Sequence, residues 1–385
     1  MTDMDLEQII ARVNSLVKDL EPYREMLLAN VVMIGEIPAP TFGEQERISF
    51  LKQRFTECGL HNCSTDELGN GLGVLPGSEG TQTILLAAHA DTPFAASEDH
   101  AYTINADRIS GSGVADNSLS LAVLATLPTI LEGLDIRFRN DLLFMGASRS
   151  LEQGNQQGLR FLLANSNRPL AAGVSIEGVP LGRLRYRSMA SLGGMIACNV
   201  NRRVSQKSAI EVLNQIIYQI GCIPLLEESH AGLVLGSVAG GASFKIPARN
   251  ARLKFQLRSD SDQTLMESKE KVENLLDEVG KEKGVSAHLE VIASTMAGGL
   301  DSSHPLVLLT RRVMTTLDLQ PRGSIYSATF SPYAEKDIPA VCIGITNGDN
   351  VNYPDEYIEI EPILTGVAQL IGILLAIDGG HCVEY

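Results

Sequence analysis

The spacing of apolar residues changes several times along this 385-residue chain, and each change indicates a different element. Residues 6–17 place apolar side chains at steps of three and four, which is typical of one face of a helix. A second helix is predicted at 43–58. Short continuous apolar runs then follow, as expected for strands that are covered on both faces. These runs are residues 83–88, 141–147, 171–176 and 339–345.

Further helices are predicted between the apolar runs, at 118–131 and 158–164. Pro128 should kink or split the first of these, because proline lacks the N–H that a helix interior requires. Strands that alternate with helices favour a sheet whose strands run mostly parallel. The predicted fold class is therefore α/β, with a mostly parallel sheet sandwiched by helices.

The pattern differs in the middle of the chain. Residues 251–258 alternate between apolar and polar side chains, which indicates a strand with one exposed face. Amphipathic helices are predicted at 208–220 and 264–279, and further strands at 194–199 and 287–292. Two helices on one face of an antiparallel sheet are close to the ferredoxin-like α+β pattern.

This middle segment is expected to fold as a unit of its own, because its sheet has one face in water. We therefore predict an α/β domain formed by residues 1–186 and 297–385. An α+β lid domain of residues 187–296 is inserted into it.

The composition narrows the classes of partner. The formal net charge of −15 argues against a nucleic-acid partner, since such a partner requires a basic face. The six cysteines form no C-x-x-C pair, which favours a reduced, cytoplasmic protein. Residues 1–20 carry charges throughout, and no apolar run approaches about 18 residues. We therefore predict neither a signal peptide nor a membrane span.

Acidic and imidazole side chains follow the predicted strands. Ligands of open α/β sheets bind just past the carboxyl ends of the strands, so these positions are candidates for a binding site. Together they offer the histidine and carboxylate groups that a metal site needs. The candidates are His89 and Asp91, Asp116 at a helix start, Glu152, Glu177 and the segment 347–352.

Each candidate also has a structural interpretation. His89 could be a hydrogen-bonded histidine without a metal, Asp116 could cap a helix, and Glu177 could be a surface acid. The coincidence of all three at successive strand ends favours a metal site over three unrelated roles.

Residues 84–93 (ILLAAHADTP) and 111–117 (GSGVADN) resemble the zinc-binding core of the co-catalytic metallopeptidases. This M20-like family includes peptidase T, carboxypeptidase G and aminoacylase. Similar elements recur along essentially the whole chain. They are Asp66 with Gly69-Asn70, Glu177-Gly178 with Gly182-Arg183 and Arg187, Gly240-Gly241 with Ile246-Pro247, His304-Pro305-Leu306, and Glu356-Tyr357.

The resemblance implies a site with two zinc ions that share a carboxylate and a water, whose proton a glutamate removes. By position, His89, Asp116 and Glu177 would hold the first metal, with Asp116 as the bridge. Asp91 would accept a hydrogen bond from the His89 ring and fix its tautomer. The residues expected for the first metal are thus all present.

The residues expected for the second metal are not. The family places a Glu-Glu pair, base and ligand, after the next strand, where this chain has Ser150-Leu151-Glu152-Gln153. Three registers are open, with the pair at Ser150-Leu151, Leu151-Glu152 or Glu152-Gln153, and none keeps two carboxylates. The last ligand of the family is a histidine, and Asn352 stands at that position. An asparagine oxygen is a poor zinc ligand beside an imidazole.

In the predicted lid, one residue of the family pattern is replaced and another is retained. Phe244 stands where the family has an asparagine that helps to polarise the scissile carbonyl. Arg258 remains, either to bind a substrate carboxylate or as an exposed charge on its strand. In the catalytic domain, the S-T-D-A-N element of the family corresponds best to residues 327–331, which lack the aspartate.

Three hypotheses follow. The first is a divergent family member that holds one zinc ion or none, has little or no peptidase activity, and binds a peptide or amino-acid-like ligand. The second is an active metal-dependent peptidase or amidohydrolase, with Glu152 as base or ligand and Asn352 or Asp349 in place of the histidine. The third is a structural or interaction subunit. The resemblance also implies a homodimer formed through the lid domain.

Overall fold

The computed structural model describes residues 6–223, 232–322, 326 and 328–382. The chain folds into two compact units. The first unit consists of Met1–Arg187 and Gly299–Tyr385, and the second of Ser188–Gly298. The chain passes between them in two short strands, β9 (Arg187–Ser188) and β14 (Gly298–Gly299).

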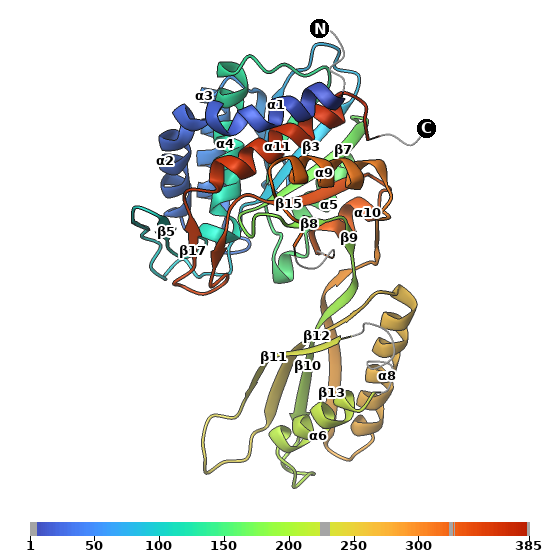
Figure 1. Cartoon of the computed structure of the whole chain (residues 1–385). Helices are drawn as coiled ribbons and strands as arrows, with labels where there is room; N and C mark the ends of the chain where they lie inside the picture. Colours follow the sequence, from blue (N-terminus) through green and yellow to red (C-terminus); the bar gives the residue numbers. More distant parts are fainter. Residues whose placement is uncertain (1–5, 224–231, 323–325, 327, 383–385) are drawn as a thin grey trace. The chain divides into compact units, whose positions relative to one another are not determined.

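The first unit is built on a seven-stranded sheet with the order β1-β2-β6-β3-β7-β15-β8. Its centre is parallel, since β3 pairs in parallel with β6 and β7, and β7 with β15. Nearly every residue of β3 is buried, which explains its uninterrupted apolar sequence. Figure 1 shows the sheet flanked by helices, and the predicted α/β class is confirmed. The strands are β1 (His61–Thr65), β2 (Gly71–Leu75), β3 (Thr83–His89), β6 (Asp141–Ala147), β7 (Leu170–Glu177), β8 (Leu184–Arg185) and β15 (Ala340–Gly344).

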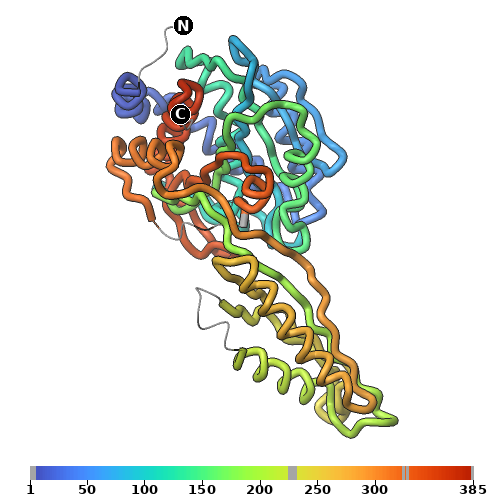
Figure 2. Tube along the Cα trace, turned by 90° about the vertical axis from the view of Figure 1, so that its right-hand side faces the viewer, coloured from blue at the N-terminus to red at the C-terminus, as the bar shows by residue number. Residues whose placement is uncertain are grey.

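The helices of the first unit share one core with this sheet. α1 and α11 lie side by side although they come from opposite ends of the chain (Figure 2). α2 has no counterpart in the sequence prediction, because its apolar residues are spread around the helix rather than along one face. The helices are α1 (Leu6–Asp19), α2 (Arg24–Gly35), α3 (Gln45–Glu57), α4 (Leu119–Gly133), α5 (Gln157–Asn165), α9 (Pro305–Thr316), α10 (Ser331–Ala334) and α11 (Ile363–Asp378).

The helix α4 continues through Pro128, so of the predicted kink or split at that residue the split is wrong. Together with the turn before it, the segment Val114–Gly133 is long and apolar enough to cross a membrane by length and composition alone. However, 89% of its most apolar window is buried inside the structure. Such burial is what a core helix shows, and one helix of this kind is weak evidence for a membrane span.

A small antiparallel sheet in the first unit connects two loops of interest. Its strand order is β16-β17-β5-β4. β5 leads toward the turn that contains Asp116, and the loop between β16 and β17 contains Asn352. The strands are β4 (Thr103–Ile104), β5 (Arg108–Ser110), β16 (Gly348–Asp349) and β17 (Tyr357–Glu359).

The second unit has a core of its own and a four-stranded antiparallel sheet with the order β11-β12-β10-β13. Its chain order, strand-helix-strand-strand-helix-strand, together with this sheet order, confirms the predicted ferredoxin-like α+β pattern. In β12, buried and exposed residues alternate as the sequence indicated. The elements are β10 (Ala190–Val200), α6 (Ala209–Gly221), β11 (Gly232–Gly240), β12 (Asn250–Ser259), α8 (Asp262–Gly280) and β13 (Val285–Thr295).

Candidate metal centre

The structure brings His89, Asp116 and Glu177 together, with one possible ligand atom from each lying within 4.8 Å of the others. His89 ends β3, and Glu177 ends the neighbouring parallel strand β7. Asp116 lies in the turn before α4. The side chain of Asn117 ties that turn to β7 by donating to the main-chain oxygen of Ile176 at 2.9 Å. We call these three side chains the triad.

The His89 ring lies between two carboxylates. Its Nε2 is 2.9 Å from Oδ1 of Asp116, and its Nδ1 is 2.9 Å from the main-chain oxygen of Asp91. Burial by itself lowers the pKa of the ring, but attraction by Asp116 and Asp91 and the hydrogen bonds to them raise it well above 6.5. When Nδ1–H donates to the Asp91 oxygen, Nε2 is the nitrogen that can bind a metal.

Asp91 holds a neighbouring loop as well as the ring. We expected its carboxylate to accept from the His89 ring, but Oδ1 of Asp91 lies 3.6 Å from Nδ1, farther than the main-chain oxygen of the same residue. Its Oδ2 instead accepts from the Thr41 hydroxyl at 2.9 Å and from the N–H groups of Ser150 and Leu151 at 2.9 and 2.8 Å. Burial raises the pKa of Asp91, but His89 and these donors outweigh it, so the pKa is lowered. Asp91 therefore fixes residues 150 and 151 against the triad.

Glu177 is paired with a cation that the sequence did not assign to the site. Nη1 of Arg183 donates to Oε2 of Glu177 at 2.8 Å, and each side chain is only 14% exposed. The other oxygen, Oε1, lies 3.4 Å from the Thr329 hydroxyl. Each oxygen of Glu177 thus has a neighbour, a guanidinium at Oε2 and a hydroxyl at Oε1. Arg183 stands three residues beyond Pro180, and its position in the sequence carries no local signal for this contact.

The space beside the triad is occupied by Ser150 rather than by a carboxylate. Ser150, His89, Glu177 and Thr329 line a cavity of about 10 Å³, close to the volume that holds one water. Glu152 lies in a short 3-10 helix and is exposed. This placement favours the register in which Ser150 and Leu151 stand at the positions of the family's Glu-Glu pair. Glu152 is not brought to the triad.

Asn352 is exposed in the loop between β16 and β17. Its main-chain N–H donates to Oε2 of Glu356 at 3.1 Å, and the other Glu356 oxygen lies 3.3 Å from the N–H of Ala115. Burial raises the pKa of Glu356 to about 8. Glu356 thus links the Asn352 loop to the turn that carries Asp116, a role that its position in the sequence did not reveal.

The remaining predicted site residues lie elsewhere. Arg258 is on the exposed face of β12 in the second unit, and its role in binding substrate stays a prediction. Phe244, also in the second unit, is 95% exposed. Ser327, the first residue of the element compared with S-T-D-A-N, lies outside the described residues.

The triad fits one metal ion. One imidazole and two carboxylates are a donor set that Zn²⁺ accepts, and a site with three protein ligands leaves a position open for water or ligand. The buried Oδ1 of Asp91 lies 3.6 Å from Nδ1 of His89, so Asp91 neighbours the ring nitrogen that does not face the triad. Within the part of the chain that the structure describes, no fourth histidine, cysteine, aspartate or glutamate joins the triad, so the residues for a second ion are not assembled.

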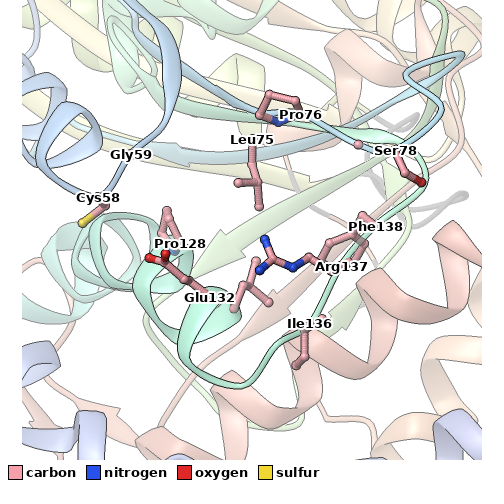
Figure 3. Close-up of a pocket in the computed structure, with 12 residues that line it drawn as sticks. Cys58, Gly59, Leu75, Pro76, Ser78, Pro128, Glu132, Ile136, Arg137 and Phe138 are labelled. Carbon is pink, nitrogen blue, oxygen red and sulfur yellow. The ribbon is translucent and has the colours of Figure 1, made fainter. Parts of the chain in front are cut away.

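A larger cavity of about 410 Å³ lies between the end of β2 and the segment that leads into β6 (Figure 3). Leu75 at the end of β2 and Phe138 just before β6 line it, and the guanidinium of Arg137 points into it. None of the predicted site residues borders this cavity. It is therefore separate from the triad.

No family model matches this sequence, and no curated protein matches it. Solved structures do. A tripeptidase from Staphylococcus aureus is 16% identical, with 92% of this chain and 98% of that chain covered and a TM-score of 0.72. The dipeptidase Dug1p from Saccharomyces cerevisiae is 12% identical, with 95% and 98% covered and a TM-score of 0.77. The YXEP protein of Bacillus subtilis, described as a dinuclear metal-binding peptidase of the M20 family, is 17% identical, with 94% and 99% covered and a TM-score of 0.65.

Identities this low establish shape rather than activity. The alignments nevertheless cover both units of the chain and nearly all of each neighbour. This protein has the fold of the M20 metallopeptidases.

Proposed function

We propose that this protein is a divergent member of the M20 fold that binds one metal ion through the triad and has weak or no peptidase activity. It binds a peptide or an amino-acid-like ligand. The observation that supports this proposal is Ser150, which lines the same small cavity as His89 and Glu177. In the register that sets Ser150 and Leu151 at the Glu-Glu pair, Ser150 takes the place of the general base that the resemblance implies. A serine hydroxyl does not accept a proton at neutral pH.

Among the described residues, Glu177 is the one carboxylate that lines the cavity beside Ser150, so the groups found there can bind and orient a ligand, but a separate general base is missing from this cavity. When bound, the metal would polarise a carbonyl and acidify a water. His89 presents Nε2 and Asp91 holds the loop at residues 150–151. Loss of a general base typically slows such a reaction by about 10² to 10⁴. We therefore expect the protein to bind ligand but to hydrolyse it slowly or not at all.

Metal content and turnover test this proposal together. The protein is purified without added metal, and zinc, cobalt and manganese are measured by mass spectrometry before and after incubation with each metal. A panel of dipeptides and N-acyl-amino acids is then assayed. We expect one metal per chain and no turnover, and Glu152→Ala should behave like the wild type because Glu152 is exposed.

The alternatives give different results. Two metals per chain with turnover that Glu152→Ala abolishes would establish the active hydrolase and refute the proposal. A protein that binds no metal, and whose melting temperature no ligand of the panel changes, would instead be a structural or interaction subunit.

We further propose that the protein forms a homodimer through its second unit. β11 is an edge strand, and it exposes Val234 by 39%, Leu235 by 48% and Val238 by 59%. An exposed apolar edge strand is suited to pairing with a second copy. Val238→Lys should therefore convert a dimer into a monomer in light-scattering chromatography, whereas Met266→Lys on α8 should not. A wild-type protein that is monomeric at all concentrations would rule this out.

A further inference from the structure

A row of arginines begins at the triad. In the extended segment 183–188, Leu184, Tyr186 and Ser188 are buried, and the residues between them are Arg183, Arg185 and Arg187. Alternate residues of an extended chain point to opposite faces, so the three arginines share one face. Arg183 is the residue that pairs with Glu177, and Arg185 lies opposite Cys342 on the edge of the main sheet.

A fourth arginine is adjacent to this row. Arg322 pairs with Arg183 in an isolated bridge, and its N–H donates to the main-chain oxygen of Gly182 at 2.7 Å. Its side chain is exposed. We call Arg183, Arg185, Arg187 and Arg322 the arginine row.

The row has few counter-charges, since Glu177 pairs with Arg183 and Asp301 attracts Arg187 without a hydrogen bond to it. Among the described residues, only Arg183 has a carboxylate within ion-pair distance. The Nε atoms of Arg183, Arg185 and Arg187 are buried and have no hydrogen-bond partner in the same part of the chain. Burial lowers the pKa of Arg185, and the neighbouring charge of Arg183 lowers it further. Glu177 and Asp116 attract Arg185 only from a longer distance.

The segment that contains Arg322 supplies no counter-charge to these cations. Residues 320–334, which include Arg322 and the segment after it, contain no aspartate or glutamate. This is unexpected in a protein with a net charge of −15. Partly buried cations without partners destabilise a fold, so a cluster of them is characteristic of a place where a ligand supplies the missing charge.

We propose that the arginine row is a binding site for a ligand carboxylate, next to the metal triad. A guanidinium presents parallel N–H groups that match the two oxygens of a carboxylate. Arg183, the first residue of the row, pairs with Glu177 of the triad. A ligand whose reactive end faces the triad would therefore place an acidic side chain on Arg185 and its neighbours. The preference for an anion follows from the row alone. The further step, that the anion is part of an acidic amino-acid derivative, rests on the proposed function.

Binding of two matched compounds tests the site. N-acetylglutamate and N-acetylglutamine differ only in the charge of the side chain, and inorganic phosphate serves as a second anion. Calorimetry is performed on chelator-treated protein, so that a failure of metal binding does not affect the result. We expect N-acetylglutamate to bind at least about tenfold more tightly than N-acetylglutamine. Arg185→Gln should remove that difference, and Arg185→Lys should retain part of it.

The stability of the ligand-free protein provides a second readout. Arg185→Gln should raise the melting temperature by roughly 1–3 °C, because it removes a partly buried charge beside Arg183. Arg311→Gln is the matched control, since Arg311 stacks on the Tyr186 ring and donates to its hydroxyl at 3.3 Å. That variant should lower the melting temperature and leave anion binding unchanged.

Three results would overturn the proposal. One is equal affinity for N-acetylglutamate and N-acetylglutamine in the wild type. Another is a marked loss of stability in Arg185→Gln, which would make Arg185 a structural residue. The third is tighter binding of phosphate than of N-acetylglutamate, which would assign the row to a different anion.

Discussion

Replacing His89 by alanine is expected to abolish metal binding by this protein. His89 supplies the only nitrogen of the triad, and its Nε2 lies 2.9 Å from the Asp116 carboxylate. Without the imidazole, two carboxylates remain, and one of them is already paired with Arg183. Such a pair is a poor zinc site. We expect affinity to fall by on the order of 100-fold or more, beyond the loss caused by removing a residue that only supports a ligand.

Calorimetry and metal analysis of His89→Ala and of a control variant measure this effect. His61→Ala is the matched control, because His61 is exposed on β1, away from the strand ends that carry the triad. Full metal content in His61→Ala and none in His89→Ala is the expected result. If His89→Ala kept one equivalent of zinc, the metal would be bound elsewhere, and the triad would be a hydrogen-bonded cluster.

The pH dependence of binding gives a second readout of the same interaction. The pKa of His89 is raised well above 6.5, so a metal must displace a proton held between His89 and Asp116. Below that raised pKa, affinity should increase about tenfold for each unit of pH, with release of about one proton. For the metal-free protein, the quantity that depends on pH is the stability of the fold, and it falls as the pH rises. There the protonated pair stabilises the fold fully below about pH 6.5, and this contribution is lost as the pH rises through the raised pKa.

Replacing Arg47 by methionine is expected to reduce the free energy of unfolding by about 3–5 kcal/mol. Arg47 lies in α3, is fully buried, and has no carboxylate partner among the described residues. It donates instead to the main-chain oxygens of Ile37 at 2.5 and 3.0 Å, Gly35 at 3.2 Å and Ala90 at 3.2 Å. Methionine fills a similar volume but leaves these oxygens buried without donors.

The same substitution should disturb the triad. Ala90 lies between His89 and Asp91, so its main-chain oxygen connects Arg47 to the end of β3. Denaturant unfolding measures the stability, and calorimetry the metal affinity. Arg54→Met in the same helix is the control, because Arg54 pairs with Glu57 at the surface and should contribute less than about 1 kcal/mol. An Arg47→Met protein as stable as Arg54→Met would show that water can replace the guanidinium.

Much of the first unit could be predicted because its signals are local. The strand Asp141–Ala147 coincides with its apolar run, since a strand buried on both faces has no polar positions to interrupt it. His89 and Glu177 could be proposed as neighbours because each directly ends a predicted strand. By contrast, α2 could not be predicted, because a helix with apolar residues all around it has no characteristic period.

By itself, the sequence determined the alternation of elements, the inserted α+β unit and the strand ends at which possible ligands stand. The tertiary structure decided which of these possible ligands lie close together. It brought Arg183 to Glu177, turned the Asp91 carboxylate toward Ser150 and Leu151, and left Glu152 exposed. It also buried Arg47 beneath the residues around Ala90. The physical reason is the distance over which each signal acts. Hydrophobic periodicity reports only the burial of each residue along its own helix or strand. An ion pair or a buried hydrogen bond depends on distances between elements, which only the packed chain sets.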